Sequence, residues 1–385
     1  MKQKIIFMLA VLSLLLSGCS WLDGYYVHVT DHREQSSKLE IEAVSAVNHI
    51  QLYGVLKEMI ASGTESAIIY VAEYDQDILQ SSMDIAVRHA ERIYPIGAYA
   101  VEQVTYEIGD SGGRRAIAVN IRYRHSTAEI QRIRSVADME EAREVAEEAL
   151  EKCSAGVVMH VADYAETDFL QIVQDYAQLH PELVMETPQV TSVAYGSGEE
   201  RVVELNFAYQ TSRDSLRSMK SQVRPVFESA VLYVSGEAAQ YRKYAQLYAF
   251  LMERFDYAQA TSITPAYSLL HHGVGDSRAF ATVYAAMCRM AGLEAMTVTG
   301  TCNGSPRTWN IVQDNGCYYH VDLLRCNSLG GFREFTDGEM GGYVWDYSAY
   351  PECLAAPVPQ TTEPVPEATE PLTIIPETTG EIPME

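Results

Sequence analysis

The feature that most constrains the fold is an internal repeat ahead of residue 236. Residues 68–74 (IIYVAEY) are echoed by residues 157–164 (VVMHVADY), and each segment is followed by an acidic turn and an amphipathic stretch. Residues 119–123 are echoed by residues 205–209 at nearly the same spacing. The shared order of strand, helix, strand, turn and strand predicts two β-α-β-β units, each closed by a further helix.

A second group of motifs follows the repeat. A glycine-rich turn, 273–281 (GVGDSRAFA), leads into an apolar stretch, 285–293 (AAMCRMAGL), and then come 308–312 (TWNIV) and 318–322 (YYHVD). In this order they resemble the motifs of the transglutaminase-like superfamily, whose fold is that of papain-type cysteine hydrolases and acyltransferases. The family pattern is Gly-x-Gly-x-Cys opening a helix, His-x-Trp-Asn on a strand, and Asp on the next strand. The resemblance implies a papain-like or transglutaminase-like α+β domain.

The resemblance places three residues at the catalytic positions of the family. Ser277 stands at the position of the nucleophilic cysteine, Arg307 at that of the general-base histidine, and Asp322 keeps the third position. Without a base, a serine hydroxyl stays protonated near neutral pH. A guanidinium does not deprotonate in proteins, but it forms bidentate pairs with carboxylates. We therefore predict a fixed Arg307–Asp322 ion pair in place of a His–Asp dyad, and a site without catalysis.

Other histidines offer an alternative base. His320 lies two residues before Asp322, and positions i and i+2 share a face of a strand. His271 and His272 precede the glycine turn. A surface or packed imidazole suffices to explain each of these histidines and is the favoured interpretation. An active transglutaminase-like or cysteine-protease-like hydrolase or acyltransferase that uses Ser277 stays open as the alternative.

A papain-like groove is the expected binding surface if the resemblance holds. Trp309, Asn310, His320 and Trp345 are the candidates for contact with a peptide, a cell-wall fragment or a partner protein. For Trp309, packing in the core is an equal alternative. The pattern calls for no cofactor, and the cysteines show no zinc-ligand spacing, so no metal site is predicted.

The N-terminus resembles a bacterial lipoprotein signal. Lys2 and Lys4 precede an apolar run, 5–16, which is too short to span a bilayer. Residues 16–19 (LSGC) match a lipobox, although an ordinary secretory peptide with a chance cysteine would look similar. Cleavage before Cys19 would leave a diacylated cysteine as a two-chain membrane anchor. We expect lipid anchoring to the extracytoplasmic face of a bacterial membrane, in the cell envelope.

The C-terminal end differs in composition from the rest of the chain. Seven of the fourteen prolines follow Ala356, interleaved with Thr and Glu, and such a tail cannot bury enough apolar surface to fold. The expected α+β chain comprises a signal peptide (1–19), a tether (20–39), two α/β repeat units (40–150 and 151–235), a transglutaminase-like domain (236–355) and a disordered tail (356–385).

The net charge bears on the class of binding partner, and the cysteine content bears on disulfide formation. With 28 Lys and Arg against 52 Asp and Glu, the net charge is −24, which argues against a nucleic-acid partner. An extracytoplasmic location permits disulfides, and one or two bridges are allowed among Cys302, Cys317, Cys326 and Cys353. Cys288 lies in an apolar stretch and is expected to be a buried thiol.

Non-catalytic binding is the favoured function. In that hypothesis the chain is a surface lipoprotein whose papain-like groove holds a peptide, a cell-wall fragment or a protein. The enzyme that uses Ser277 is the second hypothesis. The third is a spacer or interaction module in which the repeat units, 40–235, carry the partner.

Overall fold

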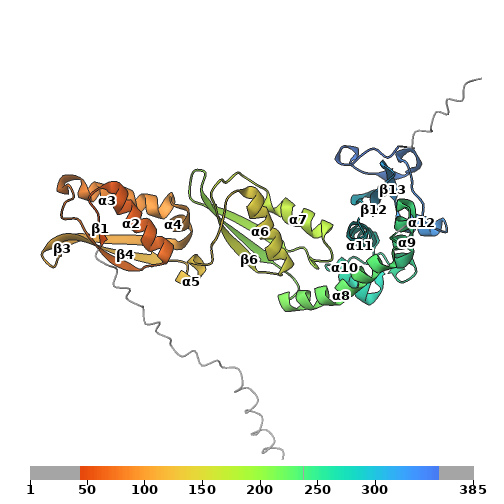
Figure 1. Ribbon diagram of the computed structural model, residues 1–385, viewed down its shortest axis with the longest axis horizontal. Coiled ribbons are helices and arrows are strands. Elements are labelled where there is room, and N and C mark those ends of the chain that lie inside the picture. Colours follow the sequence, from red (N-terminus) through yellow and green to blue (C-terminus); the bar gives the residue numbers. More distant parts are fainter. Residues whose placement is uncertain (1–43, 237, 355–385) are drawn as a thin grey trace, which may run out of the picture. The chain divides into compact units, whose positions relative to one another are not determined.

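The computed structural model describes residues 44–236 and 238–354 (Figure 1). The expected signal peptide, the lipidation site Cys19, the tether and the tail therefore lie outside the described residues. Mixed helix and strand content confirms the predicted α+β class. Within the part of the chain that the structure describes, none of the helices has the length and hydropathy to cross a membrane.

The described residues form two compact units. One contains the residues up to Ala137 together with Val158–Tyr164 and Ala194–Val203. The other contains Asp138–Val157, Ala165–Val193 and the described residues from Glu204 onward.

The first repeat unit builds a four-stranded sheet with the strand order β1-β2-β4-β3. Its elements are β1 (Val44–Ser45), α2 (His49–Ser62), β2 (Ser66–Tyr70), α3 (Gln76–Arg92), α4 (Pro95–Ala100), β3 (Val101–Ser111), β4 (Arg114–Tyr123) and α5 (Thr127–Ile130). Helices α2 and α3 cover one face of the sheet (Figure 1). Val119 and Ile121 of β4 are buried while Asn120 between them is exposed, which is the alternation of a half-buried strand.

The second repeat unit has the same topology, with the strand order β5-β6-β8-β7. Its elements are β5 (Arg134–Val136), α6 (Met139–Glu151), β6 (Gly156–Val161), α7 (Phe169–Leu179), β7 (Gln189–Tyr195) and β8 (Arg201–Ala208). The predicted β-α-β-β order is present in both sheets, as β2-α3-β3-β4 and β6-α7-β7-β8.

Each sheet also has a strand and a helix in front of the predicted pattern. The helix expected to close the first unit is α6, and it follows β5, which pairs in parallel with β6 of the second sheet. The second sheet therefore begins at Arg134, ahead of the expected boundary between residues 150 and 151. A strand of three residues is too short to show the alternation that marks a strand in a sequence.

The remaining elements surround a third, antiparallel sheet with the order β13-β12-β11-β14. They are α8 (Arg213–Tyr233), α9 (Gln240–Met252), β9 (Asp256–Tyr257), α10 (Pro265–His272), β10 (Val274–Gly275), α11 (Ser277–Met290), β11 (Ala295–Cys302), β12 (Ser305–Asp314), β13 (Cys317–Val321), α12 (Leu323–Ser328), η1 (Asp337–Glu339), β14 (Tyr343–Val344) and η2 (Tyr347–Ala349).

Helix α11 forms the centre of this region. Its residues 279–288 are all buried, so the helix is covered on every side rather than along one stripe. Helix α9 holds it through the Tyr284 hydroxyl, which donates to the Tyr244 carbonyl at 3.0 Å. On the sheet side, Asn310 Nδ2 of β12 donates to the Ala281 carbonyl at 2.9 Å. These contacts fix the N-terminus of α11 beside β12.

The cysteines do not form the bridges that the sequence allowed. All six cysteines within the described residues are free thiols, and Cys288 is buried as predicted. Cys326 Sγ instead donates to the Arg333 carbonyl at 3.3 Å, and Cys353 Sγ approaches the Pro351 carbonyl at 3.8 Å.

Candidate functional site

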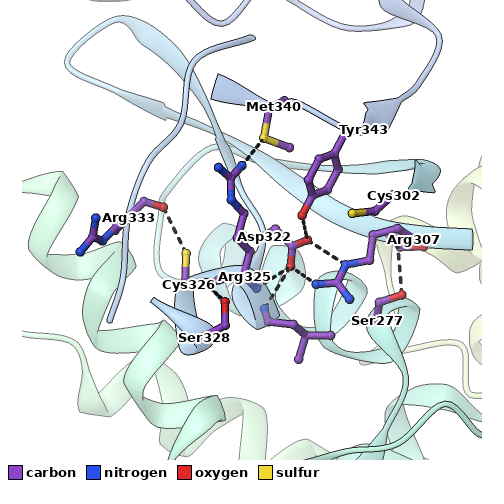
Figure 2. A network of polar contacts seen from close by, with 12 residues as sticks. Ser277, Cys302, Arg307, Asp322, Arg325, Cys326, Ser328, Arg333, Met340 and Tyr343 are labelled. Atoms are coloured by element: carbon purple, nitrogen blue, oxygen red, sulfur yellow. Dashed lines mark hydrogen bonds and ion pairs between the residues drawn. The ribbon is translucent and has the colours of Figure 1, made fainter. Parts of the chain in front are cut away.

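Ser277 is held at the N-terminus of α11 by the glycine-rich turn. Asp276 caps the helix by accepting a hydrogen bond from Ala279 N at 2.9 Å. Gly275 is required because a Cβ there would lie 2.9 Å from the Ala279 Cβ. The Ser277 hydroxyl accepts a hydrogen bond from Thr308 N of β12 at 3.3 Å (Figure 2). The hydroxyl therefore meets a backbone donor, not a proton acceptor.

The ion pair expected between Arg307 and Asp322 is present. Arg307 Nε and Nη2 each donate to one carboxylate oxygen of Asp322 at 2.7 Å, as a bidentate pair (Figure 2). Asp322 is 1% exposed, and the Arg307 side chain is 18% exposed. The pair is therefore shielded from water. Charged hydrogen bonds are stronger in such a low-dielectric environment than in water.

Three further donors complete the surroundings of Asp322. Leu324 N and Arg325 N donate to Oδ1 at 3.0 and 3.2 Å, so Asp322 also caps helix α12. The Tyr343 hydroxyl donates to Oδ2 at 2.7 Å. Burial and then the charge of Asp322 raise the pKa of Tyr343, so the phenol keeps the proton that it donates. These donors and Arg307 occupy both oxygens of the carboxylate, so it is not free to orient a base.

His320 lies in a separate network on the strand next to Arg307. Its Nδ1 accepts a hydrogen bond from Trp309 Nε1 at 2.9 Å, which requires Nδ1 to be unprotonated. Its Nε2 then carries the proton and donates to Asp337 Oδ1 at 2.8 Å. Burial lowers the pKa of His320 although Asp337 opposes this, which keeps the ring neutral. Both ring nitrogens are therefore in use, and neither can take a proton from Ser277.

The same network answers whether a metal could bind here. Potential ligand atoms of His320, Asp337 and Cys353 lie within 4.8 Å of one another. A metal would need the Nε2 lone pair, but that nitrogen holds the proton while Trp309 donates to Nδ1. Burial and then Asp337 raise the pKa of Cys353 to about 12, so its sulfur is a thiol rather than a thiolate ligand. The cluster fits a hydrogen-bonded core better than a metal site.

The four candidate groove residues do not line a groove. Trp309 is 1% exposed, Asn310 and His320 are 0% exposed, and Trp345 is 8% exposed. Trp309 packs edge-on against Trp345 with ring centres 5.8 Å apart, and Asn310 holds α11. The groove prediction is wrong for these residues because β12 is covered on both faces.

The remaining histidine candidates do not reach the hydroxyl. His271 and His272 are exposed at the end of α10 and pack with Tyr267, at ring-centre distances of 4.6 and 5.1 Å. Within the described residues, Ser277 Oγ has Thr308 N as its hydrogen-bond partner and no imidazole.

A cavity of about 650 Å³, which the sequence did not predict, lies beside the N-terminal end of α11. Arg278 and Thr282 of α11 line it together with Thr297 and Thr299 of β11 and Thr308 of β12. Residues between Gln174 and Thr187 line its other side. The alternating threonines of the 297–299 segment were the signal that could have revealed it, because residues i and i+2 share one face of a strand.

Residues 277, 307 and 322 lie together in one α+β domain (Figure 2). Its three key positions lie at a helix N-terminus, on one strand, and after the neighbouring strand. Residues 229–355 match the sequence model of the transglutaminase-like superfamily, so this part of the chain is a transglutaminase-like domain.

Three solved structures align with parts of the chain at low sequence identity. The structure of a transglutaminase ("TGase") aligns at 11% identity and a TM-score of 0.25, over 44% of this chain and 50% of that one. A "putative cysteine protease" from Cytophaga hutchinsonii aligns at 15% identity and a TM-score of 0.25, over 41% and 70%. A "putative protease" from Parabacteroides distasonis aligns at 8% identity and a TM-score of 0.22, over 43% and 39%. No curated protein sequence matches the chain.

Proposed function

We propose that the chain is an extracytoplasmic lipoprotein whose transglutaminase-like domain binds a peptide, a cell-wall fragment or a protein without turning it over. One observation carries the proposal: Arg307, the residue that the resemblance assigns to the general-base position, is bonded twice to Asp322 through its guanidinium. A guanidinium cannot accept a proton from a serine hydroxyl. His320 supports the same conclusion. Both nitrogens of its neutral ring are engaged in hydrogen bonds, so it offers no replacement base.

A residue-resolved labelling experiment tests the absence of catalysis. The purified protein is treated with a serine-directed fluorophosphonate, and the peptide that contains residue 277 is analysed by mass spectrometry. We expect no adduct on Ser277, since the hydroxyl stays protonated. An adduct at this residue in the unmodified sequence would overturn the proposal.

A reconstituted variant is the positive control. Ser277→Cys combined with Arg307→His restores the thiol and imidazole of the family pattern at the helix N-terminus, where a thiolate is stabilised. We expect iodoacetamide to alkylate residue 277 of this variant much faster than in Ser277→Cys alone. Thermal unfolding of both variants establishes that they are folded.

The lipid anchor is the second part of the proposal, and the 16–19 lipobox supports it. In a bacterial host, the Cys19→Ala variant should move from the membrane fraction to the soluble fraction, because the acylated residue is lost. Cys317→Ala, at a half-exposed cysteine, is the matched control and should stay with the membrane. Retention of Cys19→Ala in the membrane fraction would refute lipid anchoring.

A further inference from the structure

One arginine side chain lines the cavity beside α11 and has no partner within the described residues. Arg278 is exposed, and its guanidinium has neither a hydrogen bond nor an ion pair within the described residues. Glu186, the carboxylate that also lines the cavity, is 4% exposed and accepts Gln210 N at 2.6 Å and Thr211 N at 3.0 Å. Because Glu186 is already satisfied by backbone donors, the cavity presents a free positive charge in a chain of net charge −24.

Hydroxyl groups cover the sheet side of the same cavity. Thr299 of β11 lies opposite Thr308 of β12, and Thr297 lies two residues along β11, so the three share one face of the sheet. Their hydroxyls have no hydrogen-bond partner in the part of the chain that the structure describes, and all three line the cavity. They can donate to, or accept from, a polar ligand.

Strand β11 also has an unpaired outer edge beside these threonines. Strand β12 pairs with its whole length, but on the other side β14 pairs only with Thr301 and Cys302. Along residues 295–300, no other described strand pairs with that edge. An unpaired edge presents a row of backbone donors and acceptors, which is the surface that an extended peptide uses when it adds to a sheet.

We propose that this cavity binds an extended peptide that carries a free carboxylate. The peptide backbone pairs with the outer edge of β11, the threonine hydroxyls bond its polar groups, and Arg278 holds the carboxylate through two parallel hydrogen bonds. The site rests on the proposed non-catalytic function and gives it a ligand class.

Fluorescence anisotropy with three labelled Ala/Ser peptides of one length tests this site. One peptide has a C-terminal carboxylate, the second has a C-terminal amide and one internal Glu, and the third has the amide and Gln in place of Glu. We expect at least one carboxylate peptide to bind roughly tenfold more tightly than the uncharged peptide. The stronger of the two identifies whether the carboxylate is terminal or on a side chain. Equal binding of all three, or no binding, overturns the inference.

Variants connect the preference to Arg278. Arg278→Gln should remove the difference between charged and uncharged peptides, and Arg278→Lys should keep only part of it, because an ammonium lacks the bidentate geometry. Arg224→Gln, at an exposed arginine of α8 paired with Glu228, is the matched control and should bind like the unmodified protein. An unchanged preference in Arg278→Gln contradicts the assignment.

Modified peptides test the strand edge and separate the two proposals. N-methylation at alternate backbone positions should weaken binding in one register and spare the other, as strand pairing requires. Similar effects in both registers contradict edge pairing. Mass spectrometry of the peptides after incubation shows whether they stay intact. Cleavage of a bound carboxylate peptide would contradict the non-catalytic function but not the binding site. Equal binding of charged and uncharged peptides that stay intact would contradict the binding site but not the non-catalytic function.

Discussion

Arg307, which the resemblance aligns with the general base of the family, is bonded twice to Asp322 in the structure. Its guanidinium neutralises Asp322, a carboxylate that is 1% exposed and that also caps α12. A buried ion is costly unless it is paired and hydrogen-bonded. We therefore expect the loss of either partner of the Arg307–Asp322 pair to destabilise the fold.

Removal of the guanidinium should destabilise the fold. In Arg307→Gln, Asp322 keeps its backbone and tyrosine donors but loses its counter-charge, and we expect a loss of about 3 kcal/mol in the free energy of unfolding. Urea denaturation at pH 7 measures it. The exposed pair Arg224–Glu228 provides the comparison, since Arg224→Gln should change stability by less than about 1 kcal/mol. Similar losses of unfolding free energy in both variants would mean that the buried pair stabilises the fold no more than the exposed pair.

The sequence predicted one of the two polar networks and missed the other. The Arg307–Asp322 pair followed from the family pattern, which places the two positions next to each other. The network of His320 did not, because it depends on the register that sets Ile311 opposite His320. It also depends on the isolated bridge between His320 and Phe335, two residues before Asp337. Register between strands is a long-range property, and a short motif does not encode it.

At the scale of elements, length decided what could be predicted. The strands of both repeats were recognisable from periodicity. Strands β5, β9, β10 and β14 have two or three residues each and show no period. Yet β14 matters for the site, because it pairs with the end of β11 and leaves residues 295–299 without a partner strand on that side among the described residues.

Gly300 sets how closely β14 can approach β11. A Cβ at this position would lie 2.2 Å from the Val344 carbonyl oxygen and 2.9 Å from the Trp309 ring. We expect Gly300→Ala to lower the free energy of unfolding by about 2 kcal/mol, because backbone and a buried indole must both move. Gly338→Ala, where a Cβ meets nothing within 4 Å, should have little effect in the same denaturation experiment. Equal free energies of unfolding for the two variants would show that the close approach at Gly300 does not matter for stability.

At the scale of the whole molecule, two buried groups give the stability opposite dependences on pH. The pKa of His320 is lowered, so the unfolded chain binds its proton first and stability falls as the pH drops below about 6.5. Burial and then Asp314 raise the pKa of Glu334 from 4.5 to about 7. Between these values the folded chain holds a proton that the unfolded chain has lost, so stability falls as the pH rises toward 7.

Replacement of Glu334 should separate these two effects. Asp314 Oδ1 and Glu334 Oε1 are both buried without a hydrogen-bond partner in the described residues. Glu334→Gln removes the ionisation, and we expect it to stabilise the protein at pH 8 by on the order of 1 kcal/mol, with little change at pH 4.5. Chemical denaturation across this pH range measures both values. Glu144→Gln, on the exposed face of α6, is the control. A Glu334→Gln effect of equal size at both pH values would contradict the assigned titration.

The contact between Cys353 and Asp337 has a mechanical consequence. Cys353 N donates to Asp337 Oδ2 at 3.1 Å, and Asp337 is bonded in turn to His320 in the buried strand β13. Tension applied to the chain at Cys353 is therefore transmitted through Asp337 to His320 in the edge strand β13, and residue 353 separates from the domain only after these hydrogen bonds break.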